Sequence, residues 1–240
     1  MKTGIRLTAL YAYGCQAAAS DSPVGQAIKH YLTTGQDEEC LWRQYLGHLE
    51  PRHYYHLLLK TKYPRALDDF NPAIVRDYWF GNSVVLPTVH TLFTPHGGFN
   101  KLTPRPKSIG AYFLHQGVRP YHNYIVLAKA TLVGLEIPAV MMGVNQCLIS
   151  WGRVLRTQDD TLTVETWPLV FRRNRLAWAA RQQQRIKFGY LRDVRVGDLV
   201  SIHYGEARER LTPAQVARLN KYAQLAINEL NAAIKESKKR

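Results

Sequence analysis

The chain has few cysteines and no long apolar run. These two features argue against a disulfide-rich secreted protein and against a membrane-spanning protein. Its 240 residues include three cysteines, Cys15, Cys40 and Cys147, with no paired spacing, so we expect no disulfide framework and a cytoplasmic location. No run approaches the roughly 20 apolar residues that a membrane-spanning helix needs. The apolar stretch at 7–12 is short and interrupted by polar groups, which favours an ordinary first helix over a signal peptide.

Acidic residues are scarce as well. The chain carries 18 Asp and Glu against 32 Lys and Arg, a formal net charge of +14. Such an excess of basic residues predicts a positive surface that attracts anionic partners, either nucleic acids or acidic proteins. Because 46% of the residues are hydrophobic and 11% aromatic, the composition is that of a folded protein.

The sequence also lacks the short motifs of several common enzyme classes. It contains no phosphate-binding Gly-x-x-x-x-Gly-Lys loop, no dinucleotide fingerprint, no Gly-x-Ser-x-Gly elbow and no His-Glu-x-x-His helix. We therefore do not expect an enzyme of these classes.

Residues 1–120 predict a mostly helical region. Ser22 before Pro23 and Asn71 before Pro72 each place a good N-cap ahead of a proline at the first helical position. Prolines and glycines predict a loop over 87–108. Residues 121–145 are expected to form a connecting segment, with a β-like stretch at 124–128.

Residues 146–240 predict a β-barrel followed by a helix. Alternation and β-branched residues indicate strands near 147–156, 161–170, 175–180 and 198–204. A small barrel would pair such strands without long exposed edges. Thr212 and Pro213 begin a strongly amphipathic helix. The fold class is thus α+β, with a helical region and then a small, OB-like barrel that ends in a helix.

Two stretches fifty residues apart carry the candidate chemistry. The first runs from Cys147 through Ser150-Trp151-Gly152-Arg153-Val154, and the second reads Val-Gly-Asp-Leu-Val-Ser-Ile-His-Tyr-Gly from 196 to 205. A thiolate and an imidazole are ligands for soft and borderline metals. Cys147 and His203 are therefore the candidate metal ligands. The alternative is that Cys147 binds no metal and packs as a small buried apolar residue.

These two stretches resemble the HypC/HupF family of small chaperones in nickel–iron hydrogenase maturation. The resemblance extends from Cys147 to about residue 231 and implies a small barrel with a trailing helix. It also implies that Cys147 handles an iron–cyanide–carbonyl unit beside His203, with a hydrogenase large subunit or a maturation scaffold as protein partner. Gly152 and Gly197 would be turn glycines, and Asp198 and Gly205 belong to the same motif.

The whole chain also looks like an uncharacterised bacterial family associated with hydrogenase gene sets. That resemblance includes the stretch Tyr78-Trp79-Phe80-Gly81-Asn82.

Two further groups of residues could bind a ligand. Basic residues interleaved with aromatics could form a face for a protein partner or for single-stranded nucleic acid, and the protein partner is the reading we favour. They are Arg172, Arg173, Arg175, Arg181, Arg185, Lys187, Arg192 and Arg195. In the loop, His96, Gly97 and Gly98 would let the backbone approach a ligand, or form a plain exposed turn.

Overall fold

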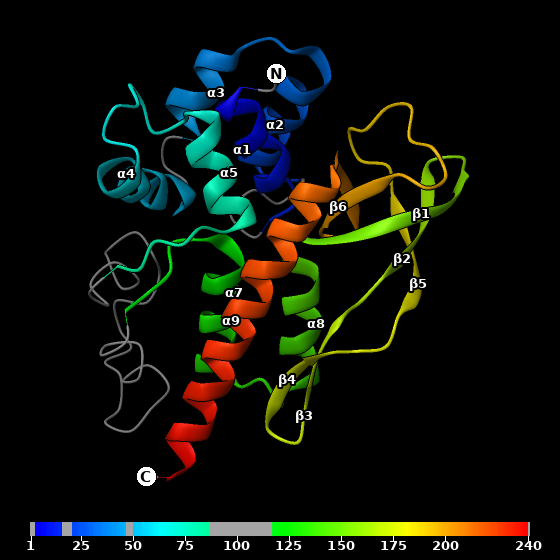
Figure 1. The fold of residues 1–240 in the computed structure, drawn as a ribbon. Helices are drawn as coiled ribbons and strands as arrows, with labels where there is room; N and C mark the ends of the chain where they lie inside the picture. The colour runs from blue at the N-terminus through cyan, green and yellow to red at the C-terminus, as the bar shows by residue number, and fades with distance from the viewer. Residues whose placement is uncertain (1–2, 16–20, 47–49, 87–116, 240) are drawn as a thin grey trace.

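The computed structural model describes residues 3–15, 21–46, 50–86 and 117–239. It confirms an α+β fold in which helices accompany a closed five-stranded β-barrel and a long C-terminal helix (Figure 1). The loop expected at 87–108, with His96, Gly97 and Gly98, lies outside the described residues.

Short helices make up the first part of the chain. Two of the expected caps are present, because the side chains of Ser22 and Asn71 accept hydrogen bonds from the N–H groups of Gly25 and Ala73. Gly35, at φ 73°, ends the first of these helices in the left-handed region. The helices are α1 (Gly4–Ala12), α2 (Pro23–Thr34), α3 (Glu38–Gln44), α4 (Glu50–Lys62) and α5 (Pro72–Phe80).

The segment expected as a connection forms two more helices. They are α7 (His122–Val133) and α8 (Pro138–Cys147), so the β-like prediction for 124–128 is wrong. Neither helix begins with a side-chain cap hydrogen bond, and α7 is apolar on most of its circumference. A helix that is buried on most sides shows no 3.6-residue period, so its sequence resembles that of a buried strand.

The barrel has the strand order β1-β2-β5-β7-β6 and closes between β6 and β1. All neighbours are antiparallel except β5 and β7. Its interior holds a separate apolar cluster that includes Val154, Leu162, Val164 and Ile186. The strands are β1 (Ser150–Gln158), β2 (Thr161–Thr166), β5 (Gln182–Lys187), β6 (Leu199–His203) and β7 (Glu206–Arg210).

A two-stranded hairpin leaves the barrel between β2 and β5. It consists of β3 (Leu169–Arg172) and β4 (Arg175–Trp178) and packs on α8 and on α9 (Pro213–Lys239), away from the barrel (Figure 1). The side-chain amide of Asn145 bonds both the N–H and the C=O of Leu169. Asn231 of α9 does the same for Leu176. These two asparagine clamps fix the hairpin to the helices.

A buried polar network joins the helical region to the barrel. The hydroxyl of Tyr11 lies 2.9 Å from Ser201 Oγ and donates to Glu209 Oε2 at 3.1 Å. Arg76 of α5 donates to both oxygens of Glu209. Burial and the Glu209 carboxylate raise the pKa of Tyr11 well above its ordinary value. Each member is hydrogen-bonded, so this part of the junction carries little desolvation penalty.

Candidate metal centre

Three potential ligands meet where the helices contact the barrel. His122 is the first residue of α7, Cys147 is the last of α8, and His203 is the last of β6. Their ligand atoms all lie within 4.8 Å of one another. We call these three residues the junction cluster. It brings together Cys147 and His203, which the sequence predicts as ligands, and adds His122, which the sequence analysis missed.

Cys147 reaches the cluster from a helix end rather than from the expected strand. A helix leaves its last carbonyls without intrahelical partners. The Cys147 carbonyl accepts a hydrogen bond from His122 Nε2 at 2.8 Å, and the same nitrogen lies 3.7 Å from Cys147 Sγ. Because a carbonyl can only accept, this bond requires the proton on Nε2. A metal bound through Nε2 would take the place of that bond.

The next residue of α7 fixes the chain beyond Cys147. Asn123 donates from its amide to the Ile149 carbonyl and accepts from the Ile149 N–H, both at 2.8 Å. This third asparagine clamp is fully buried. Successive residues of α7 therefore determine the position of Cys147 and the direction in which the chain enters β1.

His203 is completely buried, and neither of its ring nitrogens makes a well-aligned hydrogen bond within the described part of the chain, although the Tyr11 and Cys147 backbones lie close to the ring. Its ring lies 5.3 Å from that of His122, nearly perpendicular to it, and 6.1 Å from Trp79. Buried polar groups are almost always hydrogen-bonded, and an unpaired one costs roughly 1–3 kcal/mol. An imidazole retained under these conditions is suited to bind a ligand.

Both histidines are held neutral. Burial lowers the pKa of His122 to about 4, against a smaller opposing effect of its bond to the Cys147 carbonyl. Burial also lowers the pKa of His203 well below its ordinary value, with His122 and Arg208 acting in the same direction. Neutral imidazole is the form that binds metals. The cluster thus offers two uncharged imidazoles at neutral pH, of which His122 would exchange its bond to the Cys147 carbonyl for the metal.

The thiol of Cys147 is protonated at neutral pH. Its contact with the Cys15 thiol raises its pKa most, and burial raises it further. Binding of a metal to Sγ would therefore release a proton, which makes the affinity increase with pH. Two imidazoles and one thiolate suit zinc, iron, copper, nickel or cobalt better than magnesium or calcium, which prefer oxygen.

The motif glycines have different roles. Gly152 lies within β1 and not in a turn, which corrects the sequence expectation; a Cβ there would stand 3.0 Å from the Glu165 carbonyl oxygen and from Val164 Cβ. Gly197 has a φ of 94° in the turn before β6, where Asp198 accepts from the Arg195 N–H. Gly205, at φ 69°, follows Tyr204 in the two-residue turn between β6 and β7.

The basic residues do not gather on one barrel face. Arg172, Arg173 and Arg175 lie at the tip of the β3–β4 hairpin, which belongs to a separate sheet. Arg181 pairs with Glu165 at 3.4 Å, and Arg185 donates to Thr161. Lys187 and Arg192 line a pocket, and Arg195 is exposed in the turn before β6. The structure therefore divides the stretch that the sequence suggests as a single surface.

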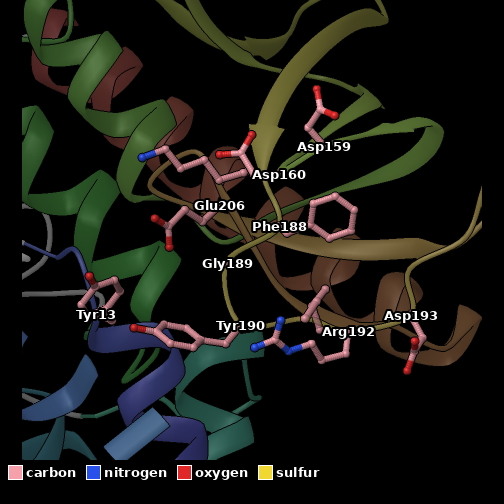
Figure 2. A pocket seen from close by; sticks show the side chains of 11 residues that line it. Tyr13, Asp159, Asp160, Phe188, Gly189, Tyr190, Arg192, Asp193 and Glu206 are labelled. Atoms are coloured by element: carbon pink, nitrogen blue, oxygen red, sulfur yellow. The ribbon is translucent and has the colours of Figure 1, made fainter. Parts of the chain in front are cut away.

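That pocket, of about 590 Å³, opens beside the β1–β2 turn (Figure 2). Its lining mixes charge and aromatic rings: Asp159, Asp160, Asp193 and Glu206, Lys187 and Arg192, and Tyr13, Phe188 and Tyr190. No short motif marks this pocket in the sequence, because its lining comes from four separate segments.

Arg208 lies between the pocket and the junction cluster. Its side chain is fully buried, and Nη2 donates to the Tyr13 carbonyl at 2.9 Å and to the His203 carbonyl at 3.1 Å. Nη1 is 2.9 Å from Glu206 Oε2, an ion pair that is close but not aligned as a hydrogen bond. Burial lowers the pKa of Arg208, and Glu206 opposes this. Arg208 thereby connects α1, the β6–β7 turn and the pocket wall.

Comparison with known proteins gives one match. The model of DUF6390, described as a family of unknown function, matches residues 3–237. No curated protein and no solved structure matches the chain. Among the described residues, no helix combines the length and apolar character required to span a membrane.

Proposed function

We propose that this chain, which belongs to the DUF6390 family, is an accessory protein that binds a transition-metal ion at the junction cluster. The observation that carries the proposal is the environment of His203. It is fully buried, neither ring nitrogen makes a well-aligned hydrogen bond within the described part of the chain, and it faces a second imidazole and a thiol. A bound metal would satisfy the ring and explain why the fold tolerates it.

Three protein ligands leave room for a further ligand on the metal. Closed structural sites use four protein ligands, whereas three ligands leave a position for water or another molecule. Trp79 and Tyr204 surround His203 and exclude bulk solvent on that side. The site therefore fits an ion that keeps an exogenous ligand.

The resemblance to the HypC/HupF chaperones makes iron destined for a nickel–iron hydrogenase the specific cargo we propose. A small barrel followed by a helix is the architecture that this resemblance implies, and the barrel here has five strands, as the OB-fold does. Here α7 and α8 supply two of the three ligands. In this proposal the helical region completes a site that the barrel alone could not form, and a hydrogenase subunit or maturation scaffold is the partner.

Metal binding to the purified protein tests the proposal. Reduced, anaerobic protein is titrated with Co²⁺, which reports thiolate ligation by its charge-transfer absorption. We expect one Co²⁺ per chain, with the affinity reduced at least 100-fold in Cys147→Ser and unchanged in Cys40→Ser, because Cys40 is exposed on α3. Stoichiometric binding that is the same in all three proteins would contradict the assigned site.

The iron-specific part of the proposal needs protein from its native host. Anaerobic purification followed by metal analysis and infrared spectroscopy should show iron with cyanide and carbonyl bands, lost in Cys147→Ala. Iron without those bands would support metal binding but reject the hydrogenase cargo.

A further inference from the structure

Cys15 places a second thiol beside Cys147 of the junction cluster. It lies in the turn after α1, where its N–H donates to the Ala12 carbonyl at 3.0 Å, and it is partly buried. It is not one of the three ligand atoms that lie within 4.8 Å of one another. Cys15 lies beside Cys147 and is not grouped with the two histidines, so a role as a fourth metal ligand does not explain its position.

Tyr204 brings the two cysteine-bearing segments together. On one side, a Cβ on Gly14 would lie 3.7 Å from Tyr204 Cβ. On the other side, the Tyr204 N–H donates to the Gln146 carbonyl at 2.8 Å. Arg208 holds the first segment in place through the Tyr13 carbonyl. The residues that follow Gly14 and Gln146 along the chain are Cys15 and Cys147.

The side chains of the two cysteines also contact each other. The thiols of Cys15 and Cys147 lie within hydrogen-bonding reach of each other, and the Tyr204 hydroxyl reaches both sulfurs. Cys40, the third cysteine, is exposed on α3 and has no such neighbour among the described residues. The chain therefore pairs two of its three thiols at the edge of the cluster.

We propose that Cys15 and Cys147 are a reversible redox pair whose disulfide closes the metal site. The oxidant is a small disulfide such as oxidised glutathione. The Cys15 thiolate attacks one of its sulfurs, which forms a mixed disulfide and releases one glutathione thiol. Cys147 then loses its proton and attacks the Cys15 sulfur, so that the protein disulfide forms and a second glutathione thiol leaves.

Thiolates, not thiols, react with disulfides. Once Cys15 carries the mixed disulfide, the Cys147 sulfur is its neighbour within the same chain, and this proximity favours formation of the protein disulfide.

The regulatory consequence rests on the proposed function. A disulfide sulfur is no thiolate, so oxidation would leave only His122 and His203 as ligands. Oxidised protein is therefore expected to release the metal, and reduction is expected to restore binding.

The test uses the full chain equilibrated in glutathione buffers of graded redox potential, then alkylated, digested and analysed by mass spectrometry. We expect a peptide joining Cys15 to Cys147 that disappears with dithiothreitol, persists in Cys40→Ser and is absent in Cys15→Ser. Glutathione found separately on Cys15 and Cys147, without the joining peptide, would overturn the proposal. The cross-link is scored without metal, so this result does not depend on whether the protein binds one.

Co²⁺ titration of the same samples tests the regulation. Reduced wild type and Cys15→Ser should bind equally, and oxidant should lower the affinity at least 10-fold in wild type only. If Cys15→Ser loses binding while folded by circular dichroism, Cys15 is a ligand and the redox pairing is overturned. Cys15→Ala serves as a second variant that separates loss of the thiol from the effect of serine.

Discussion

The interior of the barrel and its junction with the helices are built on opposite principles. The buried cluster inside the barrel is aliphatic and includes Val154, Leu162 and Ile202, with Phe188 packed against it. The junction buries His122, His203 and Arg208 among aromatic rings. The first region stabilises the barrel by apolar burial, whereas in the second region buried polar groups lower stability unless they are hydrogen-bonded.

The two regions also differ in what holds them together. Barrel strands are joined by backbone ladders that any suitable sequence can form. The junction depends on individual side chains, such as the Tyr11 hydroxyl and the Asn123 amide, that each bond a specific partner. A change of pH or a single substitution should therefore affect the stability of one region more than that of the other.

Acid should affect the junction most strongly. The unfolded chain binds a proton on His122 below about pH 6.5, while the folded chain does so only near pH 4. The unfolded state thus binds more protons in this window, and stability falls as the pH drops through it, by roughly 3 kcal/mol from His122 alone. The depressed pKa of His203 adds to the loss.

Urea unfolding followed from pH 7 to pH 4.5 measures this loss. His122→Gln removes the titrating imidazole and should therefore weaken the pH dependence of stability. The glutamine amide keeps a donor for the Cys147 carbonyl, so that hydrogen bond is not lost. A wild-type midpoint that stays constant over this range would show that the histidines titrate normally.

A cavity in the barrel interior should lower the free energy of unfolding without changing metal affinity at the junction cluster. Leu162 is fully buried on β2, and Leu162→Ala is expected to cost about 3 kcal/mol. The measurement is the urea midpoint, paired with Co²⁺ affinity at a temperature where the variant is folded. The affinity should equal that of wild type; a 10-fold loss would mean that the barrel interior and the junction cluster are coupled.

The smallest expected effect has the opposite sign. In His203→Leu an apolar side chain replaces a buried ring that makes no well-aligned hydrogen bond, and we expect stability to rise by about 1 kcal/mol. The same variant should lose Co²⁺ binding. His203→Gln, which retains polarity, is the control and should not be stabilised. Destabilisation of the leucine variant would indicate that the imidazole is already satisfied by other groups.

The sequence predicted those parts of the fold that carry local signals. The caps at Ser22 and Asn71 and the amphipathic period of α9 are each visible within a few residues. The strands β5 and β7 were missed, because Gln-Gln-Gln-Arg-Ile-Lys and Glu-Ala-Arg-Glu-Arg show no apolar alternation. In β7 the buried residues are Ala207, Arg208 and Glu209, and the two charged ones have partners in distant segments.

The candidate site was predictable only in part, for a similar reason. Cys147 and His203 stand in recognisable motifs, but the motif suggested a strand where Cys147 ends a helix. His122 lies 25 residues before Cys147 with no motif around it, and its role arises from packing between α7 and α8. Tertiary contacts of this kind leave no short-range pattern in a sequence.

The asparagine clamps have a consequence for how this chain can vary. Asn123, Asn145 and Asn231 bind main-chain groups of Ile149, Leu169 and Leu176, so they recognise a position along the chain and not the side chain found there. Substitution at the clamped residues leaves those bonds intact, whereas inserting one residue between Cys147 and Ile149 would shift the thiol against His122. Length in these segments is therefore constrained more strictly than composition.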